Sequence, residues 1–174
     1  MPDDIHIHDF PERGGTGRDG YRVLIGGAEL DFRPAALPDP VPTGRQVLDA
    51  AGARPAEEHL VFQMLPNGEL EELRLDETTD LRARKVERFL VFRGSASWRI
   101  EVDGRVLEWG AEAISGRTLK RLAGVDPDRY GLWLEVRGAG DDRPIANDEL
   151  VRVGEPGLER FFTGIQETTE GSRP

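Results

Sequence analysis

The sequence predicts two α+β domains in tandem, each a mixed β-sheet packed on one helix. Three observations lead to this fold class: an internal repeat, a pair of short strand patterns at the start of each copy, and one capped amphipathic helix per copy. A chain of 174 residues could form one ordinary domain or two small ones. The repeat decides in favour of two.

The repeat is clearest around the two helices. Residues 43–52 read TGRQVLDAAG and residues 115–124 read SGRTLKRLAG, an offset of 72. Over residues 43–92 against 115–164, 12 of 50 aligned positions are identical, where chance gives about 3. Upstream the offset becomes 77, so the first copy carries five extra residues. We expect them in the Pro-rich stretch 34–42, because loops tolerate such insertions.

Each copy opens with a predicted β-hairpin. Residues 21–25 and 98–102 alternate between apolar and polar positions, as short strands do. Gly26-Gly27 and Asp103-Gly104 are two-residue turn signals of the kind that needs positive φ. The second strands are therefore expected at 28–32 and 105–109.

A short helix follows in each copy. Thr43 and Ser115 are N-cap candidates, and Gly52 and Gly124 stand at the matching C-terminal position. The apolar residues between them fall on one helix face; they are Val47, Leu48 and Ala51 in the first copy and Leu119, Leu122 and Ala123 in the second.

Three more strands complete each unit, at 59–65, 70–75 and 86–92 in the first copy and at 131–137, 143–146 and 158–163 in the second. The single helix must cover one sheet face, because nothing else in the unit can bury it. This order is the β-grasp arrangement of ubiquitin, in which the first and last strands lie side by side. Another small α+β domain with the same element order remains the alternative.

These patterns divide the chain into five segments. We expect a disordered leader at 1–20, a first domain at 21–92, a linker at 93–97, a second domain at 98–163 and a flexible tail at 164–174. The leader is acidic and Gly-rich, and the tail TGIQETTEGSRP contains one apolar residue, Ile165.

Composition excludes several kinds of protein. The net charge of −10 argues against nucleic acid or an anionic membrane as the main partner. The absence of cysteine excludes disulfides, thiolate metal sites and a catalytic thiol. No apolar run is long enough to span a membrane, and the acidic N-terminus is unlike a signal peptide. We therefore expect a soluble, cytoplasmic protein without a cofactor.

No motif indicates an enzyme. Residues 15–20 match G-x-G-x-x-G but lack the preceding strand and following helix of a dinucleotide site. His6 and His8, with nearby aspartates, lie on the leader, where nothing would orient them around a metal. No serine has a base arranged beside it. A small enzyme that uses the acidic surface is a minor alternative.

At this point the chain resembles the bacterial multiubiquitin proteins. The resemblance covers about residues 21–171 and is carried by the helix segments, the downstream Asp-Glu pairs and the E-R-F strands. The second copy matches better, through SGRTLKRLAGVDPD, LWLEV and ERFFTGIQETTEG. The resemblance implies a ubiquitin-like modifier, with ubiquitin-activating-like and conjugating-like enzymes, a JAB-type metallopeptidase and a target protein as partners. It also implies a role in phage defence.

The resemblance assigns the reactive position to the tail. Gly171 would be exposed by cleavage before Ser172, activated with ATP, passed to an enzyme cysteine and joined to a target amine. Thr168, Thr169 and Glu170 would be recognised as the tail threads the enzyme. Glycine suits this role because it lets the backbone approach the reacting groups closely. Gly164 is a weaker alternative cleavage site.

Gly94-Ser95 superficially repeats Gly171-Ser172. Gly171 lies ten residues beyond Phe161, about 33 Å when extended, whereas Gly94 adjoins the expected final strand of the first copy. We therefore expect the tandem to remain uncut.

A tandem β-grasp adaptor that is never conjugated is the second functional hypothesis, and it predicts that removing residues 165–174 leaves function intact. The lysine content also allows two explanations. Only Lys85 and Lys120 are lysines among 23 basic residues, which would limit self-conjugation or reflect a GC-rich genome.

Overall fold

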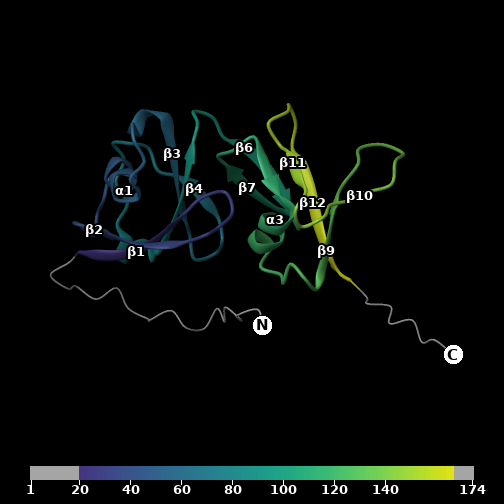
Figure 1. The fold of residues 1–174 in the computed structure, drawn as a ribbon, viewed down its shortest axis with the longest axis horizontal. Coiled ribbons are helices and arrows are strands. Elements are labelled where there is room, and N and C mark those ends of the chain that lie inside the picture. Colours follow the sequence, from purple (N-terminus) through teal and green to yellow (C-terminus); the bar gives the residue numbers. More distant parts are fainter. Residues whose placement is uncertain (1–19, 167–174) are drawn as a thin grey trace.

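The computed structural model describes residues 20–166 and contains two β-sheets of five strands each, with a smaller two-stranded sheet (Figure 1). The first half of the chain forms one large sheet and the second half forms the other. The predicted fold class, two tandem α+β domains with mixed sheets, is confirmed.

The first domain contains five strands, two helices and a 3₁₀ turn. They are β1 (Tyr21–Gly26), β2 (Arg33–Leu37), α1 (Gly44–Ala51), η1 (Ala56–Glu58), β3 (His59–Met64), β4 (Leu70–Glu72), α2 (Leu81–Arg84) and β5 (Arg88–Arg93). The strand order is β2-β1-β5-β3-β4. β1 and β5 are parallel neighbours, as predicted for the first and last strands.

The second domain repeats this plan. Its elements are β6 (Trp98–Val102), β7 (Arg105–Trp109), β8 (Ala113–Ser115), α3 (Gly116–Ala123), β9 (Tyr130–Leu134), β10 (Arg143–Pro144), β11 (Leu150–Arg152) and β12 (Glu159–Ile165). The main sheet has the order β10-β9-β12-β6-β7, and β8 pairs with β11. β12 lies at the centre, parallel to β6 and antiparallel to β9.

Both helices have the predicted caps. The Thr43 hydroxyl accepts from Gln46 N at 3.2 Å, and the Ser115 hydroxyl accepts from Thr118 N at 3.1 Å. Gly52 and Gly124 end the helices in the left-handed conformation, with φ of 71° and 78°. These contacts satisfy backbone groups that a short helix would otherwise leave without partners.

The shared Gly-Arg and Asp-Glu motifs have a structural role. Gly44 N donates to Glu77 O at 3.1 Å and Gly116 N donates to Glu149 O at 3.0 Å, so the Asp-Glu loop docks on the helix start in both domains. A Cβ on Gly44 would lie 2.4 Å from Arg74 O, and one on Gly116 would lie 2.1 Å from Ala146 O. The helix can therefore begin against this loop only with glycine.

The first hairpin differs from the prediction. β2 begins at Arg33, and Ile25 pairs with Arg33, so the two-residue Gly26-Gly27 turn and the strand at 28–32 are wrong. In the second domain Val102 pairs with Arg105 across Asp103-Gly104, as predicted. Seven residues therefore separate the last paired positions of the two strands in the first domain, and two separate them in the second. The five extra residues lie here, in the loop 26–32, and not in the Pro-rich stretch 34–42.

Turn signals in the sequence could not place this loop, because its two glycines, Gly26 and Gly27, lie at its start and five further residues follow before β2. Leu30 has a positive φ of 56°, and Phe32 packs on Gly26, where a Cβ would be 3.1 Å from the ring. Tertiary contacts thus override the local preference for a tight turn.

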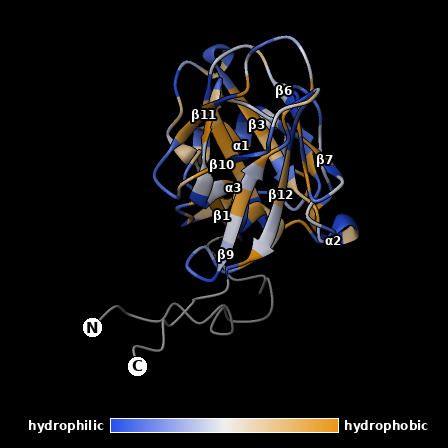
Figure 2. Cartoon of the chain, turned by 90° about the vertical axis from the view of Figure 1, so that its right-hand side faces the viewer, coloured by the Kyte–Doolittle hydropathy of each residue, from blue (hydrophilic) through white to orange (hydrophobic). Residues whose placement is uncertain are grey.

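Each face of the first sheet is buried by a different partner. One face packs on α1 through Val23, Val61 and Phe89, which belong to a core confined to the first domain. The opposite face carries Phe62, Leu90 and Phe92, which belong to the core of the second domain. Figure 2 shows hydrophobic residues in orange along the interior strands and hydrophilic residues in blue on many loops.

The two domains make direct contact at the end of β7. The rings of Phe92 and Trp109 meet edge-on with centroids 4.8 Å apart, and Phe62 meets Phe92 at 5.7 Å. Gly110 lies against these rings, since a Cβ there would be 2.5 Å from Phe92 and 2.9 Å from Phe62. One hydrophobic core therefore continues across the domain boundary.

The loop 26–32 adds polar contacts to this interface, and we call it the clamp loop. Thr118 on α3 donates to Ala28 O at 3.0 Å, and Arg121 donates to Glu29 O at 3.1 Å. At the other side of the interface, Arg105 donates to Asn67 O at 3.3 Å. The residues that distinguish the first copy from the second therefore bind the second domain.

Within residues 20–166, no helix is both long enough and apolar enough to cross a membrane.

Candidate functional site

The residues predicted to form the site are in the C-terminal tail. Thr168, Thr169, Glu170, Gly171 and Ser172 lie outside the described residues, as do His6, His8 and most of the G-x-G-x-x-G motif. The structure does describe β12, the strand that precedes these residues in the sequence.

β12 is held firmly up to its end. The Asp103 carboxylate accepts from Thr163 N and from Thr163 Oγ1, both at 2.8 Å. Ile165 pairs with Tyr130 on β9, and Gln166 N donates to Arg129 O at 3.1 Å. The strand ends two residues beyond the predicted boundary. Gly171 is five residues past Gln166, a reach of about 17 Å when extended.

Gly164, the alternative cleavage position, belongs to this strand. It pairs with Gly131, and the indole of Trp133 lies over both glycines, because Cβ atoms there would be 3.2 Å and 2.5 Å from the ring. A methyl group at Gly131 would require the Trp133 ring to move, and one at Gly164 would crowd it. Cleavage at Gly164 would need β12 to leave the sheet.

Two aromatic side chains lie beside these glycines on the sheet face away from α3. Leu132 and Phe161 are buried in the core with Leu119 of α3, and the alternation of strand residues places Trp133 and Phe162 on the opposite face. Their rings stack, with centroids 5.6 Å apart and an angle of 13° between planes. Phe162 is 37% exposed. We call this pair the aromatic platform.

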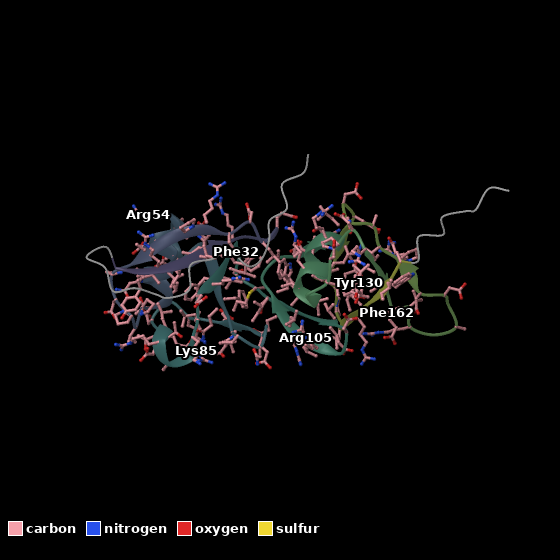
Figure 3. The ribbon with its side chains drawn as sticks, turned by 90° about the horizontal axis from the view of Figure 1, so that it is seen from below. Phe32, Arg54, Lys85, Arg105, Tyr130 and Phe162 are labelled. Carbon is pink, nitrogen blue, oxygen red and sulfur yellow. The ribbon has the colours of Figure 1, made fainter. Side chains whose placement is uncertain are left out.

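Sequence patterns did not reveal the aromatic platform. Both residues occupy strand positions, and strand aromatics are usually buried. The signal lay in their neighbours, because Gly131 and Gly164 leave room for a flat indole that only a structure can place. Figure 3 labels Phe162 and Tyr130 in the half of the molecule that holds the second domain.

Other polar groups of the described residues have structural partners. Among residues 20–166, no group of three or more acidic or histidine side chains could hold a metal ion. His59 Nδ1 lies 2.8 Å from Pro55 O, and Ser115 caps α3. Glu71 is paired with Arg84 at 2.8 Å, which holds the pKa of Glu71 below its ordinary value. These contacts stabilise loops and helix ends.

Two β-grasp units with a shared core, and a central last strand that continues into a polar C-terminal segment, define a tandem ubiquitin-like protein. Comparison with protein families then identifies the group. A family model described as multiubiquitin matches residues 28–94 and, a second time, residues 98–165, so the chain belongs to the multiubiquitin family. No curated protein matches the chain.

Proposed function

We propose that this protein is a ubiquitin-like modifier, cleaved after Gly171 and joined through that glycine to target proteins. One observation carries the proposal: β12 lies at the sheet centre up to Ile165, Gln166 N is still hydrogen-bonded to Arg129 O, and the sequence places Gly171 five residues further on. An enzyme that binds the second domain and admits a short polar C-terminal segment into a channel needs this arrangement, because the bound domain orients the terminal glycine for reaction.

The proposed partners are an activating-like enzyme that uses ATP, a conjugating-like enzyme and a JAB-type metallopeptidase. The peptidase would cleave the Gly171–Ser172 bond with a metal-activated water. We place this chemistry in the bacterial cytoplasm, in an antiphage conjugation system of the kind that the family resemblance implies.

The position of Gly94 supports an intact tandem. Gly94 N donates to Glu58 O at 2.8 Å, directly after β5, and the Phe92 ring two residues earlier is buried against Trp109. A peptidase needs several extended residues before the scissile bond, and this segment has none free. We therefore propose that a single modifier carries both domains.

Truncations of the tail test the proposal. The full chain, a chain lacking 172–174 and a chain lacking 171–174 are incubated with ATP and the three enzymes, and products are read by mass spectrometry. The 172–174 deletion should form conjugates without the peptidase, and the 171–174 deletion should form none. Conjugation by the latter, or a mature end other than Gly171, would refute the assignment.

We also propose that the aromatic platform is where the tail-binding enzyme contacts the second domain. The corresponding face of the first domain already binds a protein surface, the Gly110 turn with its neighbouring Trp109. Phe162 of the aromatic platform belongs to β12, the strand that precedes the tail. An enzyme that binds the platform therefore has a raised local concentration of the tail.

A double variant, W133A/F162A, tests this contact. Thioester formation at limiting enzyme should slow about tenfold, equivalent to about 1.4 kcal/mol of binding energy, while circular dichroism stays unchanged. Saturating enzyme should restore the rate, because the tail itself is intact. An unchanged rate at limiting enzyme would remove the aromatic platform from the proposal.

A further inference from the structure

The two lysines of the chain occupy opposite environments. Lys120 is 4% exposed, whereas Lys85 is exposed on the surface of the first domain (Figure 3). All other basic side chains among the 23 are arginines. A guanidinium does not serve as an acyl acceptor, because it stays protonated at all relevant pH values. The accessibility of two amines therefore decides where this protein can itself be modified on a side chain.

Lys120 is a structural residue. Its Nζ donates to Asn147 Oδ1 at 2.6 Å and to Pro127 O at 3.0 Å, and Asn147 Nδ2 donates to the same carbonyl at 3.1 Å. Burial lowers the pKa of Lys120. The repeat places Leu48 at the same helix position of the first domain, fully buried. Withdrawing the amine would leave both acceptors without this donor inside the fold, which costs free energy.

The backbone around Lys85 is held in place by a capped helix before it and a buried residue after it. It follows α2 with a left-handed φ of 53°, and Asp80 caps that helix by accepting from Arg82 N at 3.0 Å and Ala83 N at 3.2 Å. The next residue, Val86, is 3% exposed and anchors the turn in the core. The Lys85 amine makes no hydrogen bond or ion pair with any other described residue.

The neighbouring cations are already engaged. Arg84 donates to both oxygens of Glu71, at 3.0 and 2.8 Å, and Arg82 Nε lies 3.4 Å from Asp80 Oδ1. Among the described residues of this turn, Lys85 is therefore the cation without a hydrogen-bond or ion-pair partner. Figure 3 places Lys85 in the first domain, whereas Figure 1 shows β12 in the other half of the molecule.

We propose that Lys85 is the acceptor at which one copy of this protein receives Gly171 of another copy. In the step, the neutral Lys85 amine attacks the carbonyl carbon of a Gly171 thioester on an enzyme cysteine. The C–N bond forms, the C–S bond breaks, and the thiolate takes up the proton that the amine releases. The inference rests on the proposed conjugation through Gly171.

A single donor and a single side-chain acceptor determine the product. Each copy can be joined to one copy through its own Gly171 and to another through Lys85. The polymer is consequently linear, unbranched and uniform in linkage, and its successive copies run from second domain to first domain.

Amine labelling tests accessibility without any conjugating enzyme. The folded full chain is treated with a limiting N-hydroxysuccinimide ester and digested for mass spectrometry. Lys85 should react at least tenfold faster than Lys120, and urea should abolish the difference. Equal rates in the folded chain would overturn the assignment of Lys120 as protected.

Reconstituted conjugation tests the acceptor itself. The wild-type chain and K85R, in which Lys120 is the only remaining lysine, are incubated with ATP, the three enzymes and a target. We expect K85R to keep its enzyme thioester and its single attachment to the target but to lose chains of linked copies. Chains formed by K85R through Lys120 or a terminal amine would overturn the proposal.

A wild-type chain that forms thioester and target conjugates, but never linked copies, would also overturn it. The two levels fail differently, because absence of any Gly171 thioester contradicts the proposed function and leaves the labelling result standing.

Discussion

The same sheet face is closed in the first domain and open in the second. Leu90 on β5 pairs with Phe62, and Phe162 on β12 pairs with Trp133, so Leu90 and Phe162 are equivalent positions. Leu90 is fully buried beneath the second domain, whereas Phe162 is 37% exposed. The first domain buries this face against the second domain, and the second domain leaves it partly exposed. Within residues 20–166, the two domains therefore differ in how this face is covered.

Truncation of the equivalent pair should give the largest contrast. L90A removes a buried side chain at the shared core and should lower the free energy of unfolding by about 2–5 kcal/mol. F162A removes a stacked but exposed ring and should cost under about 1 kcal/mol. Urea unfolding measures both; similar losses would mean that the two faces are not energetically different.

A methyl group at Gly110 should disrupt the closed face next. G110A places a Cβ 2.5 Å from the Phe92 ring, and overpacking of this kind costs about 1–3 kcal/mol. The matched control is G27A, where the nearest atoms lie 3.9 Å away. Thermal unfolding should separate the two variants, and an unaffected G110A would contradict the close domain contact.

The clamp loop should contribute a smaller amount. T118V removes the hydroxyl that donates to Ala28 O at 3.0 Å and should cost about 1 kcal/mol. T79V is the control, because Thr79 makes a buried hydrogen bond with Gln63 inside the first domain. Hydrogen exchange of Leu30 N, which donates to Gly27 O, should accelerate in T118V only. Faster exchange of Leu30 N in both variants would contradict the idea that the Thr118 hydrogen bond holds the clamp loop in place.

The smallest effect should be a pH-dependent one in the second domain. Arg143 donates to the Glu149 carboxylate, and so does Ala146 N. Both hydrogen bonds lower the pKa of Glu149 below its ordinary 4.5, and that from Arg143 has the larger effect. A lowered folded-state pKa adds stability above the unfolded-state pKa, and this stability is lost as the pH falls through the folded-state value.

E149Q should therefore be slightly less stable than wild type near neutral pH, and the difference should vanish once the pH falls below the lowered folded-state pKa of Glu149. Paired urea titrations at several pH values measure it. A difference that is constant with pH would assign the effect to the amide substitution and not to the ionised carboxylate.

The sequence predicted the elements whose signals are local. The caps at Thr43 and Ser115, the glycines that end both helices and the Asp103-Gly104 turn each follow from one residue type in one conformation. The adjacency of the first and last strands followed from the β-grasp order.

Features that depend on tertiary contact were missed. The strand pattern of β5 and β12 does not say which of Leu90 and Phe162 is covered, because the cover is another domain. Lys120 occupies a helix position that Leu48 fills in the first copy, and only the loop containing Asn147 makes a buried lysine tolerable. The predicted tail residues lie outside the described part of the chain, so their roles remain predictions.

The clamp loop also fixes the order of the two repeats. The first domain supplies Ala28 and Glu29 to α3, while the second has only Asp103-Gly104 at that hairpin. The residue equivalent to Gly110 in the first copy is Pro38, whose ring would collide where glycine fits against Phe92. Exchanging the two halves of the gene would therefore join the same secondary structure in an order that cannot close. The five additional residues of the first copy and the glycine of the second make the two copies complementary and not interchangeable.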